Sequence, residues 1–445
     1  MDSKAFFLRR WYYENRYKLP ECVDDLITYL YHRFARIPYI GTRPTSKLFE
    51  GVEIVPFKYD RKGAFCVSTT LELAWGWRYG KNKKYRSDFP PLGRKNAHIL
   101  LELSEQYSIP ITWAVVGHLF LQECKRHTTG LAHHNMPRPN GFYERHHMWD
   151  WLSGDWYQND PCSNVEKEPL WYAPDLINKI INSPISQEIG THSFSHIDFS
   201  HPSCSTELAR SELEECIKVM RKYGLTPRSM VFPGGLADCY LDILASSGII
   251  AYQGGLNKMT YPERKEEGIW NINGSLYLTR GRGYDYYKRA MDNINKAIEN
   301  HLVFNLVLSD PMFYPFEHAE AIKYIFENVL RYAYDQRTKD LLWITTLSEI
   351  ARYCEARETT RVNCIHNQNE IMVTISSILD HQRFGYPEIT LKVKIPNNLI
   401  TKRVECETKK VVLGTEDCYS ISNENTLVVT VPVSTKNIKI QIKEA

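Results

Sequence analysis

The sequence lacks the patterns that mark exported, membrane-spanning and nucleotide-binding proteins. Its first 21 residues, MDSKAFFLRRWYYENRYKLPE, interrupt every apolar run with charge. They therefore contain neither the apolar core of a signal peptide nor a transmembrane span. No GxGxxG follows the first predicted strand, and no P-loop of the GxxxxGK type occurs. A dinucleotide site and a P-loop phosphate site therefore find no support.

A strong charge bias and paired cysteines are also missing. The formal net charge is only +3, from 55 basic and 52 acidic residues, so no overall field selects nucleic acid or an anionic membrane as a partner. The eleven cysteines form no CxxC pair, which argues against a structural zinc site built from cysteines. An odd number of thiols without an export signal predicts reduced cysteines and a cytoplasmic location. The oligomeric state stays open.

The composition predicts one large hydrophobic core and a second, smaller one, because 43% of the 445 residues are hydrophobic. Residues 1–54 carry apolar residues at helical spacing, as in Leu26, Leu30 and Phe34, and predict an N-terminal helical extension. The basic and aromatic cluster of residues 9–13 fits either a helix packed on its own domain or a docking surface.

Residues 55–357 alternate short apolar runs with amphipathic segments. The helix predicted at 206–223 shows the pattern well, because its apolar residues fall on one face, with Ser205 able to cap its start. Such alternation predicts an α/β fold with a parallel sheet, here a distorted (β/α) barrel of about seven strands. The predicted strands are residues 65–73, 111–116, 187–189, 229–232, 249–252, 302–308 and 341–345.

Residues 358–445 change to period-2 alternation without helices, separated by turn clusters such as 396–398 and 422–425. This pattern predicts a small C-terminal all-β domain of the sandwich type. Glycan binding and a structural or docking role are both open for it.

The segment of residues 121–171 contains no convincing long element but is rich in His, Trp, Pro and Asp. A long insertion in a compact domain is usually functional or disordered, and its aromatic residues argue against disorder. They could stack on sugar rings in a cleft, or simply pack the insertion onto the barrel.

A pair of histidines predicts a metal site. His192 and His196 lie four residues apart, directly after the predicted strand that ends near Ile189. Imidazole suits zinc and other transition metals, but a catalytic zinc site usually takes three protein ligands and keeps one position open. Glu72 is the only carboxylate in the first barrel strand and its exit, and is the expected third ligand. The alternatives are two polar loop histidines and a glutamate paired with a barrel Arg or Lys.

These motifs resemble those of the polysaccharide deacetylases, the NodB-homology carbohydrate esterases, over about residues 55–356. The family's second motif is present as residues 192–196, HSFSH, after Glu188-Ile189-Gly190. Residues 111–118, ITWAVVGH, look like the family's second barrel strand. The resemblance implies a divalent metal, zinc being expected, and a carbohydrate substrate or ligand.

The family's third motif corresponds to residues 231–235, VFPGG, which should form one wall of a substrate groove. Glycines there would let a ligand approach the backbone, or would only make a tight turn. The residues expected to bind substrate are Trp75, Pro233, Gly234 and Gly235.

Both proton-transfer positions depart from the family pattern. Thr70 stands where the family carries the aspartate that acts as general base, and Asp310 stands where it carries the histidine that acts as general acid. A threonine hydroxyl does not accept a proton near neutral pH, and losing a general base typically costs roughly 100-fold to 10,000-fold in rate. Other residues for proton transfer are His118, Asp155, Asp160 and Asp198.

The sequence is consistent with three functions. The first is a metal-dependent hydrolase that removes N-acetyl groups from a carbohydrate, with Glu72, His192 and His196 as metal ligands. The second is a catalytically degenerate relative that binds a glycan or a protein partner without turnover. The third keeps hydrolysis and moves the proton transfer to neighbouring loops.

Overall fold

The structure is a computed structural model, and it describes most of the chain. The described residues are 39–79, 83–139, 154–201, 203–235, 239–255, 257–277, 284–309, 319–367, 369–396, 399–406, 419–422 and 426–444. The predicted helices of residues 1–38 and the predicted acid Asp310 lie outside these ranges.

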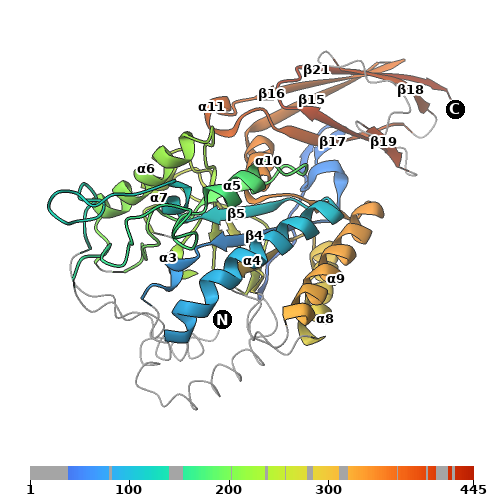
Figure 1. Cartoon of the computed structure of the whole chain (residues 1–445). Coiled ribbons are helices and arrows are strands. Elements are labelled where there is room, and N and C mark those ends of the chain that lie inside the picture. The colour runs from blue at the N-terminus through green and yellow to red at the C-terminus, as the bar shows by residue number, and fades with distance from the viewer. Residues whose placement is uncertain are drawn as a thin grey trace, which may run out of the picture.

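A curled, mostly parallel sheet forms the centre of the molecule (Figure 1). Neighbouring strands run in the order β8-β7-β6-β5-β4-β13, all parallel, and β14 pairs with the start of β4. The seven predicted apolar runs are all strands, so the predicted α/β barrel is confirmed. Their bounds are β4 Gly63–Leu71, β5 Ile111–Val115, β6 Glu188–Thr191, β7 Ser229–Val231, β8 Ala251–Gly254, β13 Val303–Ser309 and β14 Leu342–Ile344.

Sequence analysis missed two short strands, which extend the sheet beyond β8 and beyond β13. β11 (Trp270–Asn273) pairs in parallel with β8, and β12 (Leu276–Tyr277) pairs in parallel with β13. Only Gly274 and Ser275 separate them, and Ser275 donates its N–H to the carbonyl of Asn305 in β13 (2.9 Å). β12 has only two residues, and buried Asn271 and Asn273 interrupt the apolar residues of β11, so neither run carries an apolar strand signal.

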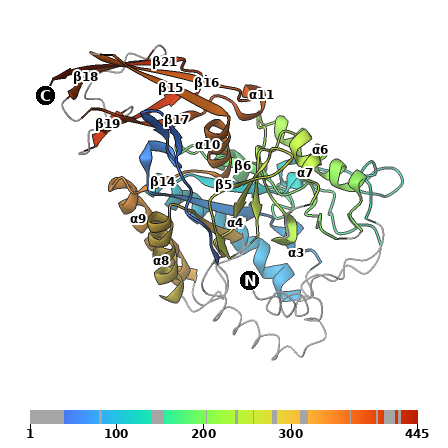
Figure 2. The ribbon, with the colours of Figure 1, turned by 180° about the vertical axis from the view of Figure 1, so that it is seen from behind.

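Helices cover the outside of the barrel, with α4, α8 and α9 on one side (Figures 1 and 2). Ser205 caps α6 as predicted, because its side chain accepts a hydrogen bond from the N–H of Leu208. α4 begins at Lys83 and passes through Pro90 and Pro91. The helices are α3 Ala74–Trp77, α4 Lys83–Tyr107, α5 Pro174–Ile181, α6 Thr206–Arg221, α7 Leu241–Ser246, α8 Tyr284–Asn300, α9 Ala319–Thr338 and α10 Leu347–Thr359.

The C-terminal strands build two antiparallel sheets beside the barrel (Figure 1). One has the order β15-β16-β21-β18 and the other β19-β20-β17-β3-β2. The short helix α11 (His381–Phe384) precedes β17. The strands are β15 Thr360–Asn367, β16 Glu370–Ser377, β17 Glu388–Lys394, β18 Leu399–Cys406, β19 Tyr419–Ser422, β20 Thr426–Pro432 and β21 Asn437–Glu444.

Residues 39–54, predicted as part of the helical extension, form strands instead. β2 (Lys47–Phe49) and β3 (Val52–Ile54) complete the second C-terminal sheet, and β1 (Tyr39–Ile40) pairs with β9 (Lys258–Met259). The apolar positions of β3 bury Val52 and Ile54 on one face, a period-2 pattern too short to detect beside the helical spacing upstream. The N-terminal part of the chain therefore contributes to the C-terminal β layer.

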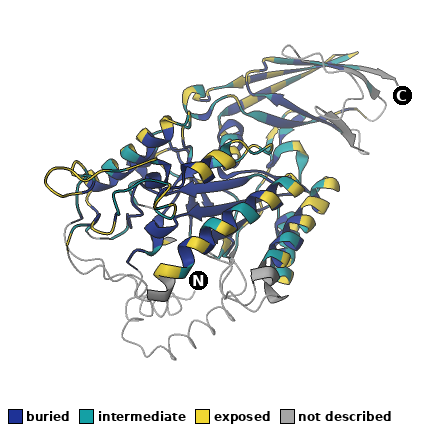
Figure 3. Ribbon diagram, viewed as in Figure 1, coloured by how far each residue is buried: buried dark blue, intermediate teal, exposed yellow. Residues whose placement is uncertain are grey.

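Burial is continuous from the barrel into the C-terminal sheets (Figure 3). One apolar cluster joins Ala64 and Trp343 of the barrel, Ile350 of α10, and Leu391 and Ile440 of the two sheets. In the described residues, no helix is long and apolar enough to cross a membrane.

Candidate metal centre

Glu72, His192 and His196 come together at the carboxyl ends of the barrel strands, as predicted from the sequence. Glu72 directly follows β4 and His192 directly follows β6. β5 lies between these strands, and its Val115 carbonyl accepts a hydrogen bond from the N–H of His192 (3.0 Å). Parallel strands thus deliver the three side chains to one edge of the sheet.

The three side chains face one another with their ligand atoms close together. Nε2 of His192 lies 3.5 Å from Oε1 of Glu72, and Nε2 of His196 lies 3.3 Å from Oε2. All three residues are buried, with 2%, 4% and 9% exposure for His192, His196 and Glu72. Two imidazoles and one carboxylate are a donor set for a divalent transition metal, and three protein ligands leave a coordination position open.

A backbone carbonyl sets the tautomer of His192. Nδ1 lies 2.6 Å from the carbonyl oxygen of Val231 at the end of β7, and because a carbonyl only accepts, Nδ1 carries the proton. Nε2 therefore presents its lone pair to the cluster, and this buried atom has no hydrogen-bond partner. This is the arrangement that metal-binding histidines adopt, so the residues fit a metal ion.

Burial and charge oppose each other at Glu72. Burial raises the pKa of its carboxyl, but the charge of His196 and the closeness of both imidazoles together hold the pKa well below its usual value. Burial lowers the pKa of His196, against the opposing charge of Glu72. The carboxylate and the neutral imidazole are the forms that bind a metal.

Thr70 supports the carboxylate from the end of β4. Its hydroxyl donates to Oε1 of Glu72 (2.5 Å), so the residue that the resemblance aligns with a general base is here a hydrogen-bond donor. Gly76 in α3 lets Glu72 approach closely, because a Cβ at Gly76 would lie 2.0 Å from Oε2. Thr70 and Gly76 thus both help to orient the carboxylate of Glu72.

Glu212 of α6, which sequence analysis missed, holds the loop between the two histidines. Its Oε2 accepts from the N–H groups of Phe194 (3.0 Å) and Ser195 (2.7 Å), and its Oε1 accepts from the hydroxyls of Ser195 (2.6 Å) and Tyr157 (3.1 Å). Glu212 is fully buried, and burial raises its pKa. The loop needs this support because Ser193 and His196 have positive φ values of 60° and 59°.

A signal for Glu212 does exist in the sequence. The residue falls between Leu208 and Cys216 at spacings of four, within the apolar stripe of α6. A carboxylate inside such a stripe is rarely buried without hydrogen-bonding partners, so the stripe itself could have pointed to Glu212.

The predicted substrate residues occupy different environments. Trp75 is only 1% exposed but lines a small pocket beside His196 with Arg78 and Trp156. The guanidinium of Arg78 lies over the rings of Trp75 (4.7 Å) and Trp156 (4.4 Å). The role of Trp75 in binding substrate stays a prediction.

Pro233, Gly234 and Gly235 follow β7, the strand whose Val231 carbonyl orients His192. Pro233 is buried and Gly234 is exposed. Gly234 has a φ of 77°, a conformation that favours glycine. The structure thus shows the turn that the motif predicts, and a groove wall there stays a prediction.

The other proposed proton-transfer residues have their own partners. Asp155 accepts from Nε of Arg138 (2.5 Å), and Asp198 accepts from the backbone N–H of Ser200 (2.9 Å). His118 and Asp160 contact each other (3.1 Å) within a second cluster of ligand-type side chains.

Comparison with known proteins identifies a family over part of the chain. Residues 88–249 match the family model "Polysaccharide deacetylase", a stretch that includes both metal-site histidines and begins after Glu72. No curated protein matches the chain significantly.

Several solved structures are similar to the chain at low identity. One is a protein from Mycobacterium smegmatis assigned as a polysaccharide deacetylase, with 13% identity, coverage of 71% of this chain and 98% of that chain, and a TM-score of 0.47. The Puue allantoinase has 13% identity, coverage of 67% and 92%, and a TM-score of 0.46. A family 4 carbohydrate esterase from Bacillus anthracis has 16% identity, coverage of 66% and 83%, and a TM-score of 0.31. Residues 88–249 of this chain therefore match a polysaccharide deacetylase domain.

Proposed function

We propose that the protein is a metal-dependent hydrolase that removes N-acetyl groups from a carbohydrate. The observation that carries the proposal is the convergence of Glu72, His192 and His196 at the barrel's carboxyl edge, in a chain whose residues 88–249 match a polysaccharide deacetylase domain. The histidine and carboxylate donors favour zinc. When bound, the metal would lower the pKa of a water molecule and polarise the carbonyl of the N-acetyl group.

The chain's own residues supply the rest of the site. The Val231 carbonyl fixes the ring of His192, and Thr70 fixes the carboxylate of Glu72. Glu212 holds the backbone between the two histidines. Trp75 and Trp156 pack beside His196 and are both buried, so they exclude water from that side of the site and strengthen charge interactions there.

Release of acetate from acetylated chito-oligosaccharides tests this function. Wild type loaded with zinc should release acetate, and His192→Ala should release none, because it removes one of only three ligands. His366→Ala changes an exposed histidine in β15 and is the matched control. Equal rates for wild type and His192→Ala would refute the proposal.

Binding without turnover is the second candidate, and the state of Thr70 favours it. The residue at the base position donates its hydrogen bond to Glu72 and offers no carboxylate to accept a proton. A protein of this kind would bind acetylated oligosaccharide in a zinc-dependent manner and release no acetate. Isothermal titration calorimetry beside the acetate assay distinguishes the two candidates.

A further inference from the structure

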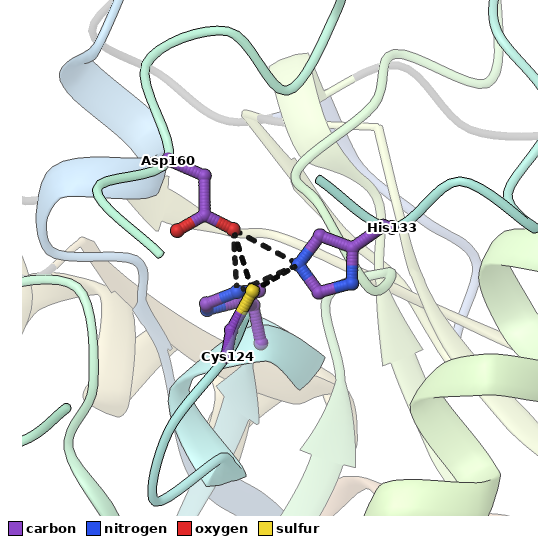
Figure 4. Close-up of side chains that lie close together, drawn as sticks. Cys124, His133 and Asp160 are labelled. Atoms are coloured by element: carbon purple, nitrogen blue, oxygen red, sulfur yellow. Dashed lines mark hydrogen bonds and ion pairs between the residues drawn. The ribbon is translucent and has the colours of Figure 1, made fainter. Parts of the chain in front are cut away.

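A second group of four ligand-type side chains lies apart from the site described above. It consists of His118, Cys124, His133 and Asp160, whose ligand atoms lie within 4.8 Å of one another. His118 follows β5 in a short 3-10 helix at 117–120, and the other three belong to the insertion of residues 121–171. Figure 4 shows the side chains of Cys124, His133 and Asp160 converging on one point.

The distances to Sγ of Cys124 equal the edges of a tetrahedral zinc site, and the three distances among the nitrogen and oxygen atoms are a few tenths of an ångström shorter than such edges. Nε2 of His118 lies 3.0 Å from Nε2 of His133 and 3.1 Å from Oδ2 of Asp160, and the last two atoms are 2.9 Å apart. Sγ of Cys124 lies 3.5 Å from Nε2 of His133 and from Oδ2 of Asp160. A tetrahedron with zinc–ligand bonds of about 2.0–2.3 Å has edges of roughly 3.3–3.5 Å.

Hydrogen bonding outside the cluster turns the lone pairs inward. Nδ1 of His118 donates to the carbonyl of Trp171 (3.2 Å), so in the neutral ring Nε2 carries a lone pair. Oδ1 of Asp160 accepts from the N–H of Cys162 (2.9 Å) and the hydroxyl of Tyr172 (3.1 Å). Oδ2 is thereby aimed at Nε2 of His118, and both residues are fully shielded from solvent.

A bare imidazole nitrogen facing a carboxylate oxygen in a buried site is unfavourable, because two lone pairs then oppose each other. A single N–H from His133 can satisfy only one of these acceptors. A cation at the centre satisfies the imidazoles, the carboxylate and a thiolate together. Outer hydrogen bonds that orient metal ligands in this way are a general feature of metal sites.

We propose that His118, Cys124, His133 and Asp160 hold a structural zinc ion. The thiolate and two imidazoles select zinc over the hard cations, and four protein ligands leave no position for a substrate. The absence of CxxC pairs suggested that cysteines hold no structural zinc, but a site with a single cysteine and ligands spread from 118 to 160 has no such motif to detect.

The structural role follows from where the ligands lie. Over the described residues 121–139 and 154–171 the insertion has no helix and only an isolated bridge, Glu123 with Asn164. Such a segment cannot build a large core of its own, and a metal ion can replace one. The ion would join two stretches of the insertion to the end of β5.

The same ion would also support the Glu72 site. The N–H of His118 donates to the carbonyl of Phe194 (3.0 Å), the residue midway between His192 and His196. The ring of Phe194 contacts the rings of His118 and His133, with centroids 5.7 and 5.3 Å apart. Folding of the insertion and the geometry of the first site are therefore linked through Phe194.

Cobalt substitution of the full chain, kept in reductant, tests the second site directly. A cysteine thiolate bound to cobalt(II) gives a near-ultraviolet charge-transfer band, and the Glu72 site contains no thiolate. Wild type should show the band and bind two cobalt ions per chain. Cys124→Ser should lose the band and bind one ion, while Cys162→Ser should keep both. Cys162 is the matched control because its Sγ lies 3.4 Å from Sγ of Cys124.

Two results would overturn the proposal. One is a wild-type protein that binds cobalt without the thiolate band, and the other is a band that survives in Cys124→Ser. If Cys124→Ser fails to fold, the Glu72→Gln variant is tested in its place. Zinc should still raise the melting temperature of Glu72→Gln, because its second site is intact. No shift on adding zinc to Glu72→Gln, or a Cys124–Cys162 disulfide in the protein as purified, would also contradict the proposal.

Discussion

The two clusters of ligand-type side chains differ in number, donor type and position. Glu72, His192 and His196 follow strands of the barrel, and His196 borders a small pocket. His118, Cys124, His133 and Asp160 include a thiol and lie mostly in an insertion. Three ligands on rigid strand ends can leave a coordination position for chemistry, whereas four ligands with a thiolate close the site. Ligand count and scaffold thus separate a candidate for catalysis from a candidate for stability.

The largest effect is expected from Glu72→Gln. The amide removes the only anionic ligand of the first site, so zinc-dependent acetate release should fall to less than about one-hundredth of the wild-type rate. This loss exceeds the roughly 10-fold to 100-fold loss of activity that follows removal of a residue hydrogen-bonded to a metal ligand. The thiolate-to-cobalt band should remain. Glu166→Gln, at an exposed position of the insertion, is the control. Loss of the band in Glu72→Gln would show that the clusters are not independent.

A gain of activity is expected from Thr70→Asp. Thr70 lies within hydrogen-bonding distance of Glu72, so a carboxylate there can accept a proton from the attacking water. Acetate release should rise by about 100-fold or more, the factor that a positioned base supplies. The gain should appear only in zinc-loaded protein, because without the cation two carboxylates repel each other.

Thr70→Asn is the matched control, since it has the shape of aspartate and accepts no proton at neutral pH. A wild type that is already active and a Thr70→Asp variant that is slower would mean that another residue is the base. Equal gains in Thr70→Asp and Thr70→Asn would also exclude the base role.

A smaller effect is expected from Glu212→Gln. The amide cannot accept all four hydrogen bonds that the carboxylate receives, so one buried donor is left unpaired at a cost of about 1–3 kcal/mol. Metal affinity at the first site should fall roughly 10-fold to 100-fold. Equilibrium dialysis with zinc and thermal melts measure the two effects. Unchanged zinc affinity would show that Glu212 supports the fold and not the site.

Most of the barrel could be predicted from the sequence, because buried parallel strands are apolar runs between amphipathic helices. The prediction was wrong for residues 39–54, where β2 pairs with β3, and β3 pairs with β17, a partner more than 300 residues away. It also missed β11 and β12, because β12 is only two residues long and buried asparagines interrupt the apolar residues of β11. Long-range pairing and buried polar strands leave little local trace.

The metal site could likewise be predicted only in part. His192, His196 and Glu72 could be predicted because ordered motifs place them after apolar strands. The spacing of Glu212 within the apolar stripe of α6 indicates a buried, hydrogen-bonded carboxylate, but not that its partners are the N–H groups between the two histidines. The second cluster assembles from residues 118, 124, 133 and 160 without a regular interval, and only folding of the insertion brings them together.

The central claim is that the Glu72 site carries out deacetylation, and a cobalt titration of the metal-free full chain tests it most directly. Acetate release and the thiolate-to-cobalt band are followed in the same samples. We predict that the thiolate site fills first, because it has four ligands, and that acetate release rises only as the second equivalent binds. Acetate release that follows the thiolate band, or no release with both sites filled, would contradict the account.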